Sequence, residues 1–501
     1  MTALLCGLTA PAGAEPAASA ERCAALLAID PGELAGRGDA EVDAMARCHE
    51  AAGHLSVAVA LREQLLATDP EGPRAQETLY ALAKNAVALT DYEDAAERFE
   101  AYAERYAADD RADAALRAAY ELRLSLGDGE RAEADRVKWE SRYGRRDPRA
   151  AAALFWSRRA VLTSDAQRIQ HARAYLKTYA ARGGVDGRVV AEVALGQLLW
   201  RKACAQVVDH DLCLKVSRRA ASPAQATHEE LARLRQRLSS RSAPPKRCGS
   251  PTHGEITVWR RDRALADEAQ ARFAAALALS ARAPSPPTDE PGPLEAYRDA
   301  VATARVYLAD ARFEAYLGLE LPPALELHVD EWKRGSGVPK WEREVEAQSK
   351  RRAESVRRLA AFLEQKRRLG ADLMAAYAEV RSAGSVRWTV TSLARQAGVL
   401  ASHADQLYRA EVPAGVRSEA LWSFCDALAD QAEAVERSAR RRVRGCVQAA
   451  KEAQVVSDDA LACVAELQQR APATHPANHG LLGAPRELLI SVGVQGGRGG
   501  S

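Results

Sequence analysis

Cysteine and histidine are the residues of this sequence whose types could hold a metal ion. Only one group mixes them: Cys204, His210, Cys213, Cys248 and His253. Zinc sites usually pair ligands two to four residues apart, whereas Cys204 and Cys213 are nine apart and Cys248 and His253 are five apart. The spacing favours cystines or buried thiols, so we expect no metal and no cofactor.

Motifs for catalysis are missing from the sequence. It contains no Walker loop, no HExxH, no GxSxG and no GxGxxG between a strand and a helix. The Gly-rich end, VQGGRGGS, precedes no helix and therefore does not predict a phosphate cradle. We expect a protein that is not an enzyme, and a hydrolase hidden in the C-terminal half is the least supported alternative.

Two basic stretches suggest a different kind of binding. Residues 340–368 hold ten Lys and Arg against five Glu, and residues 437–444 hold five Arg. Such runs can contact phosphates, which keeps open a cytoplasmic nucleic-acid-binding or regulatory protein. Acidic residues interleave at helical spacing in the first run, however, and that pattern is typical of a solvated helix face.

The N-terminus has the pattern of a shortened secretory signal. An apolar run at 3–8 is followed by Ala12, Gly13 and Ala14, an A-x-A cleavage pattern, but no Lys or Arg precedes Arg22. A disordered Ala-rich leader is the alternative. Cleavage after Ala14 would leave eight of the nine cysteines, an even number that suits an oxidising compartment.

Two pairs of these cysteines lie on successive helical segments. The turn around 31–39 can fold the segments of Cys23 and Cys48 into a hairpin, and the VVSDD turn does the same for Cys446 and Cys463. Antiparallel helices that approach closely can bring two Cα atoms within the ~7 Å that a disulfide needs. We expect both disulfides; buried, reduced thiols are the alternative.

Composition predicts an all-α protein. Hydrophobic residues make up 47% of the chain and aromatic residues only 5%, so Ala and Leu dominate. The net charge of +2 gives no global reason to expect binding to nucleic acid or to an anionic membrane.

A small residue recurs at nearly constant intervals in the first part of the chain. Ala58, Ala95, Ala132 and Ala172 are separated by 37, 37 and 40 residues. A further helical segment precedes each of them. These intervals fit one helical hairpin each, because a tetratricopeptide hairpin needs about 34 residues.

The segment 76–109 resembles a tetratricopeptide repeat. Leu79 and Leu82 match its first helix, and Tyr92, Ala95 and Phe99 match its second. Arginine replaces the Phe99 equivalent in the flanking repeats, at positions 62 and 136. The resemblance implies helix pairs that cross at the alanines and stack into a solenoid.

Pro-rich stretches at 241–254 and 283–293 end this region. Longer helical patterns follow, among them 340–369 and 371–381. We therefore expect five parts: a truncated signal peptide at 1–14, tetratricopeptide-like repeats at 15–240, Pro-rich loops around one helix at 241–293, long helices at 294–470 and a flexible tail at 471–501.

Residues 380–470 resemble the C-terminal half of large exported tetratricopeptide proteins of myxobacteria and related deltaproteobacteria, some of them associated with gliding motility. Trp388, Arg395 and Gly398 match one helix of that pattern, and Pro413 matches a loop. The resemblance implies an exported helical scaffold and brings no catalytic residue.

The sequence therefore predicts a non-enzymatic scaffold that binds a protein or peptide in the periplasm or cell envelope. Repeat arrays bind partners through side chains on their inner helices. We expect exposed Tyr92, Tyr120 and Arg123 to be such side chains.

Overall fold

Helices make up nearly all of the described structure, as the Ala- and Leu-rich composition predicts. This computed structural model describes residues 17–29, 37–205, 211–217, 255–283, 291–408, 410–412 and 418–470. The expected leader and tail lie outside these residues, as does the stretch 241–254. The chain divides into two units, Met1–Gly184 and Val185–Ser501.

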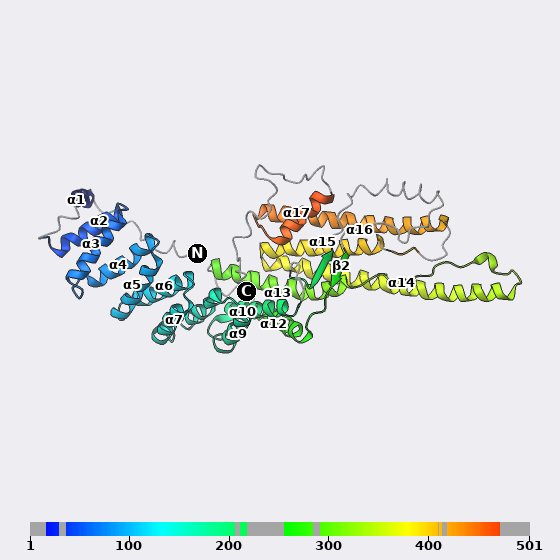
Figure 1. Cartoon of the computed structure of the whole chain (residues 1–501), viewed down its shortest axis with the longest axis horizontal. Helices are drawn as coiled ribbons and strands as arrows, with labels where there is room; N and C mark the ends of the chain where they lie inside the picture. Colours follow the sequence, from blue (N-terminus) through cyan, green and yellow to red (C-terminus); the bar gives the residue numbers. More distant parts are fainter. Residues whose placement is uncertain are drawn as a thin grey trace, which may run out of the picture. The chain divides into compact units, whose positions relative to one another are not determined.

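Antiparallel helix pairs follow one another through the first unit (Figure 1). The helices α2, α4, α6 and α8 each pack against the helix that comes next in the chain. The expected fold class is confirmed, because these pairs form a tetratricopeptide-like solenoid. The helices of this unit are α1 (Ala17–Leu27), α2 (Asp39–Ala51), α3 (Leu55–Thr68), α4 (Ala75–Ala88), α5 (Tyr92–Arg105), α6 (Ala112–Ser125), α7 (Gly129–Tyr143), α8 (Pro148–Ser157), the short η2 (Arg158–Val161) and α9 (Asp165–Thr178).

Side-chain caps start the second helix of three pairs. Asp91, Asp128 and Ser164 each accept a hydrogen bond from the backbone N–H three residues further on. A cap satisfies a donor that the first helical turn leaves unpaired. Gly127 precedes one of these caps with a φ of 79°, a conformation that glycine adopts without a steric penalty.

Small residues fill the places where paired helices approach each other. Ala95 is fully buried and lies on α5 beside Phe99, which is 3% exposed. A large ring next to a small residue fills the gap between two close helices. The other repeat residues are buried as well: Leu79, Leu82, Ala58, Ala132 and Ala172.

We predict that Ala95→Leu destabilises the first unit by about 1–3 kcal/mol, because the added carbons overpack a full site. Chemical denaturation of the full chain, followed by circular dichroism, measures the change. Ala88→Leu is the matched control, since Ala88 is exposed near the end of α4. Equal midpoints for the two variants would contradict the assigned helix crossing.

Buried arginines replace the large ring in the flanking repeats. Arg62 is 3% exposed and donates to Glu50. Arg136 is 6% exposed and donates to Glu133 and Glu140 at 2.8 and 2.6 Å. Because an unpaired buried charge is costly, these carboxylates allow arginine to fill the position.

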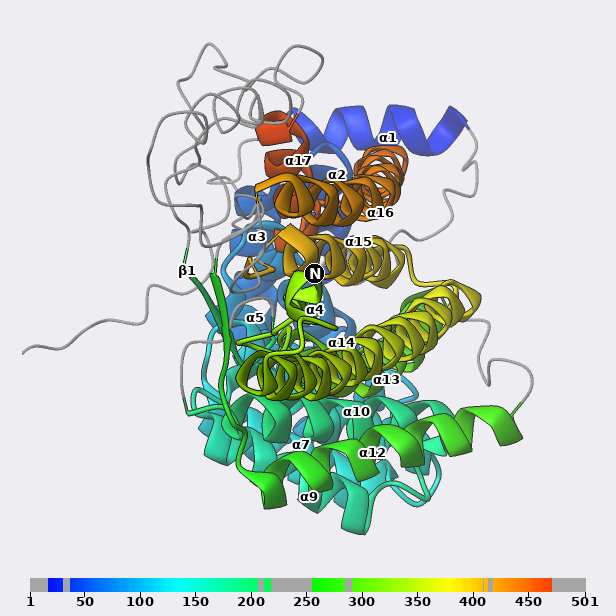
Figure 2. The ribbon, with the colours of Figure 1, turned by 90° about the vertical axis from the view of Figure 1, so that its right-hand side faces the viewer.

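Longer helices make up the second unit. The helix α14 packs against α13, and α15 packs against both α14 and α16 (Figure 2). The helices are α10 (Gly184–Lys202), α12 (Arg263–Arg282), α13 (Pro291–Leu317), α14 (Pro339–Glu379), α15 (Val386–Tyr408), α16 (Ser418–Glu452) and α17 (Asp458–Arg470), with the short η3 (Glu331–Lys333) and η4 (Val380–Ala383).

Two expectations about helix limits differ from the structure. The patterns at 340–369 and 371–381 merge into the single helix α14, in which Gly370 faces Tyr316 of α13. We also expected the repeats to continue to 240, whereas α10 packs within the second unit. A Cβ on Gly196 of α10 would lie 2.7 Å from the ring of Phe273 of α12, so the close approach of these helices requires glycine.

The second unit also contains two short strands, which the all-α prediction did not include. The strands β1 (Leu214–Ser217) and β2 (Glu255–Val258) pair antiparallel, with Leu214 opposite Val258 (Figure 2). Next to them, Cys213 accepts a hydrogen bond from the backbone N–H of Trp259 at 2.8 Å. The pairing joins segments on either side of residues 218–254 and fixes the position of residues 211–213.

Candidate functional site

Two of the three expected partner-binding side chains are buried, which corrects the prediction that they are exposed. Tyr120 is fully buried and donates to the carbonyl oxygen of Leu154 at 2.6 Å. Arg123 is 1% exposed and donates to Glu100 at 2.8 Å. Both side chains therefore hold neighbouring helices together. Tyr92 is partly exposed at the start of α5.

A second charged group lies in this interior. Asp135 of α7 is 3% exposed, and its Oδ2 is buried without a hydrogen-bond partner among the described residues. Burial, and then the neighbouring Glu100 carboxylate, raise the pKa of Asp135 to about 7. The folded chain therefore holds a proton here that the unfolded chain loses near pH 4.

We predict that the stability of the first unit falls as the pH rises from about 4 to about 7. In this window the folded state binds more protons than the unfolded state, so the free energy of unfolding decreases with pH. Asp135→Asn should remove most of this dependence. Urea denaturation between pH 4 and 8 tests it, and an unchanged slope in the variant would contradict the assignment.

Partly exposed side chains line one side of the first helices in successive pairs; we call this the first-helix face. Its residues are Tyr80 and Lys84 on α4, Arg117 and Glu121 on α6, and Trp156 and Arg159 on α8 and η2. The spacing of three or four residues puts both members of each pair on the same side of their helix.

Two charged groups of the first-helix face are partly desolvated. Desolvation raises the pKa of Glu121 although its side chain is only partly buried. Desolvation likewise lowers the pKa of Arg159, whose guanidinium lies 4.7 Å from the ring centroid of Trp156 and whose side chain is exposed. Helical spacing in the sequence could have indicated these residues. On α6, however, the sequence prediction chose Tyr120 and Arg123, which lie on the buried side of the helix, instead of Arg117 and Glu121.

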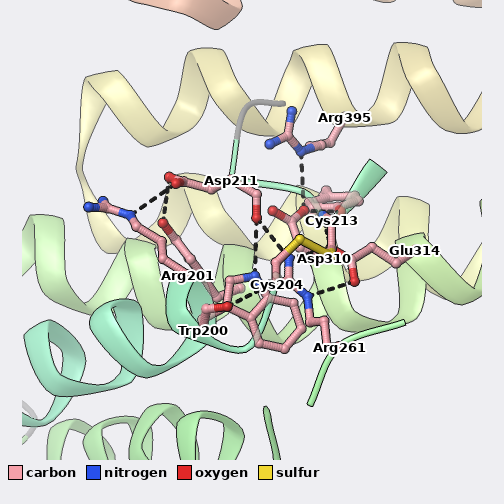
Figure 3. Close-up of polar contacts among 11 residues, drawn as sticks. Trp200, Arg201, Cys204, Asp211, Cys213, Arg261, Asp310, Glu314 and Arg395 are labelled. Carbon is pink, nitrogen blue, oxygen red and sulfur yellow. Dashed lines mark hydrogen bonds and ion pairs between the residues drawn. A yellow bond between two sulfur atoms is a disulfide. The ribbon is translucent and has the colours of Figure 1, made fainter. Parts of the chain in front are cut away.

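A buried ion pair organises the polar interior of the second unit (Figure 3). Arg261 donates to Glu314 at 2.6 Å and to the carbonyl oxygen of Asp211 at 3.0 Å, and its guanidinium stacks 3.7 Å from the ring centroid of Trp200. Glu314 also accepts from the backbone N–H of Cys213 at 2.7 Å. These contacts fix the segment around Asp211 against α10 and α13.

Both carboxylate oxygens of Asp211 accept hydrogen bonds. Its φ is 64°, a conformation that is uncommon for residues other than glycine. Oδ1 accepts from Arg201 at 3.1 Å, and Oδ2 accepts from the hydroxyl of Tyr307 at 2.6 Å. The surrounding contacts therefore maintain a strained backbone, which is a frequent property of functional sites.

A second polar group lies next to Asp211. Asp310 of α13 is 1% exposed, and its Oδ1 accepts from the hydroxyl of Tyr377 at 2.5 Å and from Arg395 at 3.2 Å. Arg395 also pairs with Asp459 at 3.1 Å. Trp388 and Arg395 are both buried on α15.

These groups surround a small cavity of about 80 Å³, which we call the Asp211 cavity. Residues from a loop, α13, α15 and the start of α17 line it: Asp211, Tyr307, Asp310, Arg387, Trp388, Thr391, Arg395, Ser457, Asp458 and Asp459. No sequence signal brings these residues together, because they lie on four separate segments.

Three pairs of cysteines with both members in the described part of the chain lie at disulfide distance. The Cα atoms of Cys23 and Cys48 are 5.3 Å apart, and those of Cys446 and Cys463 are 6.3 Å apart. These are the two pairs that the sequence suggested. A third disulfide joins Cys204 to Cys213, with Cα atoms 5.6 Å apart. It closes the segment that carries Asp211.

Binding of phosphates, of a metal ion or of a membrane finds less support in the described residues. Acidic partners neutralise part of the basic run on α14, as in the pairs Lys350–Glu346 and Arg367–Glu364. Among the residues that the structure describes, no group of three or more His, Cys, Asp or Glu could hold a metal ion. Within the same residues, no helix is long and apolar enough to cross a membrane.

Comparisons with known proteins add little. No protein-family model matches the chain, and no curated protein matches it. Among solved structures, yeast Tom70 is 9% identical, over 87% of this chain and 93% of the Tom70 chain, with a TM-score of 0.21. A likeness at this TM-score carries no argument about fold or function.

Proposed function

We propose that the protein is a non-enzymatic helical-repeat scaffold that binds a segment of another protein on the first-helix face. The observation that carries this proposal is the row of accessible aromatic and charged side chains on the first helices of successive hairpins, from Tyr80 through Glu121 to Arg159. Stacked hairpins present concave surfaces of this kind to extended partners. Aromatic rings and arginine are also the side chains that contribute most at protein interfaces.

Capture of partners from the cell envelope tests this role. We expect the unaltered full chain to retain specific proteins, and Glu121→Lys combined with Arg159→Glu to lose them, since the charges of two of the face's side chains are reversed. Arg131→Glu is the matched control, because Arg131 is 53% exposed on α7, a second helix. Identical sets of captured proteins for all three chains would contradict binding at this face.

We further propose that the protein works in the periplasm or the cell envelope of a bacterium. Three disulfides among the described residues support this location, because disulfides persist in oxidising compartments and are rare in the cytosol. The signal-like N-terminus and the resemblance to exported myxobacterial proteins point the same way.

Alkylation of thiols in the native protein tests the location. We expect Cys23, Cys48, Cys446 and Cys463 to resist alkylation until a reductant is added, and mass spectrometry should recover the linked peptides Cys23–Cys48 and Cys446–Cys463. Protein expressed in a reducing cytosol and alkylated in the same way is the control. Free thiols at all four positions in envelope preparations would argue against both the disulfides and export.

A further inference from the structure

The Asp211 cavity has an excess of negative charge. Four carboxylates line it, from Asp211, Asp310, Asp458 and Asp459, against the guanidinium groups of Arg387 and Arg395. Arg395 is already paired with Asp310 and Asp459. Arg201, behind Asp211, neutralises part of that carboxylate. Among the described side chains, the carboxylates around the cavity thus outnumber the guanidinium groups, which suits a cation better than an anion.

One acceptor at the base of the cavity is unused. Both hydrogen bonds to Asp310 go to Oδ1, so Oδ2 accepts none from the described residues. The Asp310 side chain is 1% exposed and lines the cavity, so a group held there can reach this carboxyl. A guest that carries N–H donors and a positive charge would satisfy this oxygen.

The walls and the size of the cavity restrict that guest further. Trp388 and Tyr307 form an aromatic wall, with ring centroids 6.0 Å apart and planes at 67°. Aromatic faces attract cations and also accept methylene groups. A water needs ~10–15 Å³ of such space, so a cavity of about 80 Å³ admits a group of a few heavy atoms.

We propose that the Asp211 cavity binds a primary ammonium group at the end of an alkyl chain. The ammonium donates to the carboxylates of Asp310 and Asp211, and the methylenes lie along Trp388. A compact ammonium with three donors fits converging carboxylate oxygens. This site lies in the second unit and does not depend on the proposed role of the first-helix face.

Isothermal titration calorimetry on the oxidised full chain tests the proposal with 1,5-diaminopentane and with the peptide acetyl-Gly-Lys-Gly-amide. We expect both probes to bind. Tighter binding of the peptide would identify a lysine side chain as the source of the ammonium, and tighter binding of the diamine would identify a free amine. The same peptide with Nε-acetyl-lysine should not bind, because it lacks the charge.

Asp211→Asn should weaken binding of either amine about tenfold or more, since it removes one full charge beside the guest. Asparagine tolerates a positive φ, so the loop should keep its conformation. Asp267→Asn, the same charge change on exposed α12, should leave the affinity unchanged. If the Asp211→Asn variant does not fold, Asp458→Asn serves as the second test variant. Asp458 is exposed in the first turn of α17, so its substitution should weaken binding only about two- to threefold.

Three results would overturn the proposal. One is the absence of amine binding to the unaltered chain at an amine concentration of about 20 mM, which is high enough to detect a weak small-molecule site. Another is equal amine affinity in the chain carrying a cavity substitution and in the Asp267→Asn control. The third is binding of inorganic phosphate in place of the amines, which would make this an anion site.

Discussion

The close approach of helices through small residues is the constraint on which both units depend. In the first unit the fully buried Ala95 lies beside Phe99. In the second, a Cβ on Gly398 of α15 would come 3.1 Å from the ring of Phe313 of α13. Each close crossing thus combines a small residue with one ring. This economy explains how a chain with only 5% aromatic residues fills the cores of both units.

Packing of this density excludes water, so charges in the interior need partners from the protein itself. Lys366 of α14 is 1% exposed and donates to the carbonyl oxygens of Tyr316 and Leu319 at the end of α13, at 2.7 and 3.3 Å. Carbonyls at a helix C-terminus attract a cation, but no carboxylate faces this one among its described contacts. Burial accordingly lowers the pKa of Lys366 to about 7. Both this lysine and Asp135 therefore titrate near neutral pH.

The helical hairpins could be predicted because their signal is local. The interval between Ala58 and Ala95 already contains one complete hairpin. The burial of Arg123 could not be predicted, since its partner Glu100 lies on the preceding helix pair and residue type alone suggests an exposed arginine. The Asp211 cavity was beyond prediction for a related reason: Asp310 and Asp459 meet only after α13, α15 and α17 have packed. The strand pairing of Leu214 with Val258 likewise depends on contacts between distant segments.

The disulfide between Cys204 and Cys213 connects the location of the protein to the geometry of this cavity. It joins residues nine apart in the sequence, on either side of Asp211, and a cross-link restricts the conformations open to the unfolded chain. That loop presents Asp211 at a positive φ, and a strained residue persists only where its surroundings hold it. In a reducing compartment, the hydrogen bonds from Arg261, Arg201 and Tyr307 would hold the segment without the cross-link. An oxidising compartment thus favours the arrangement of charges that the proposed ammonium site requires.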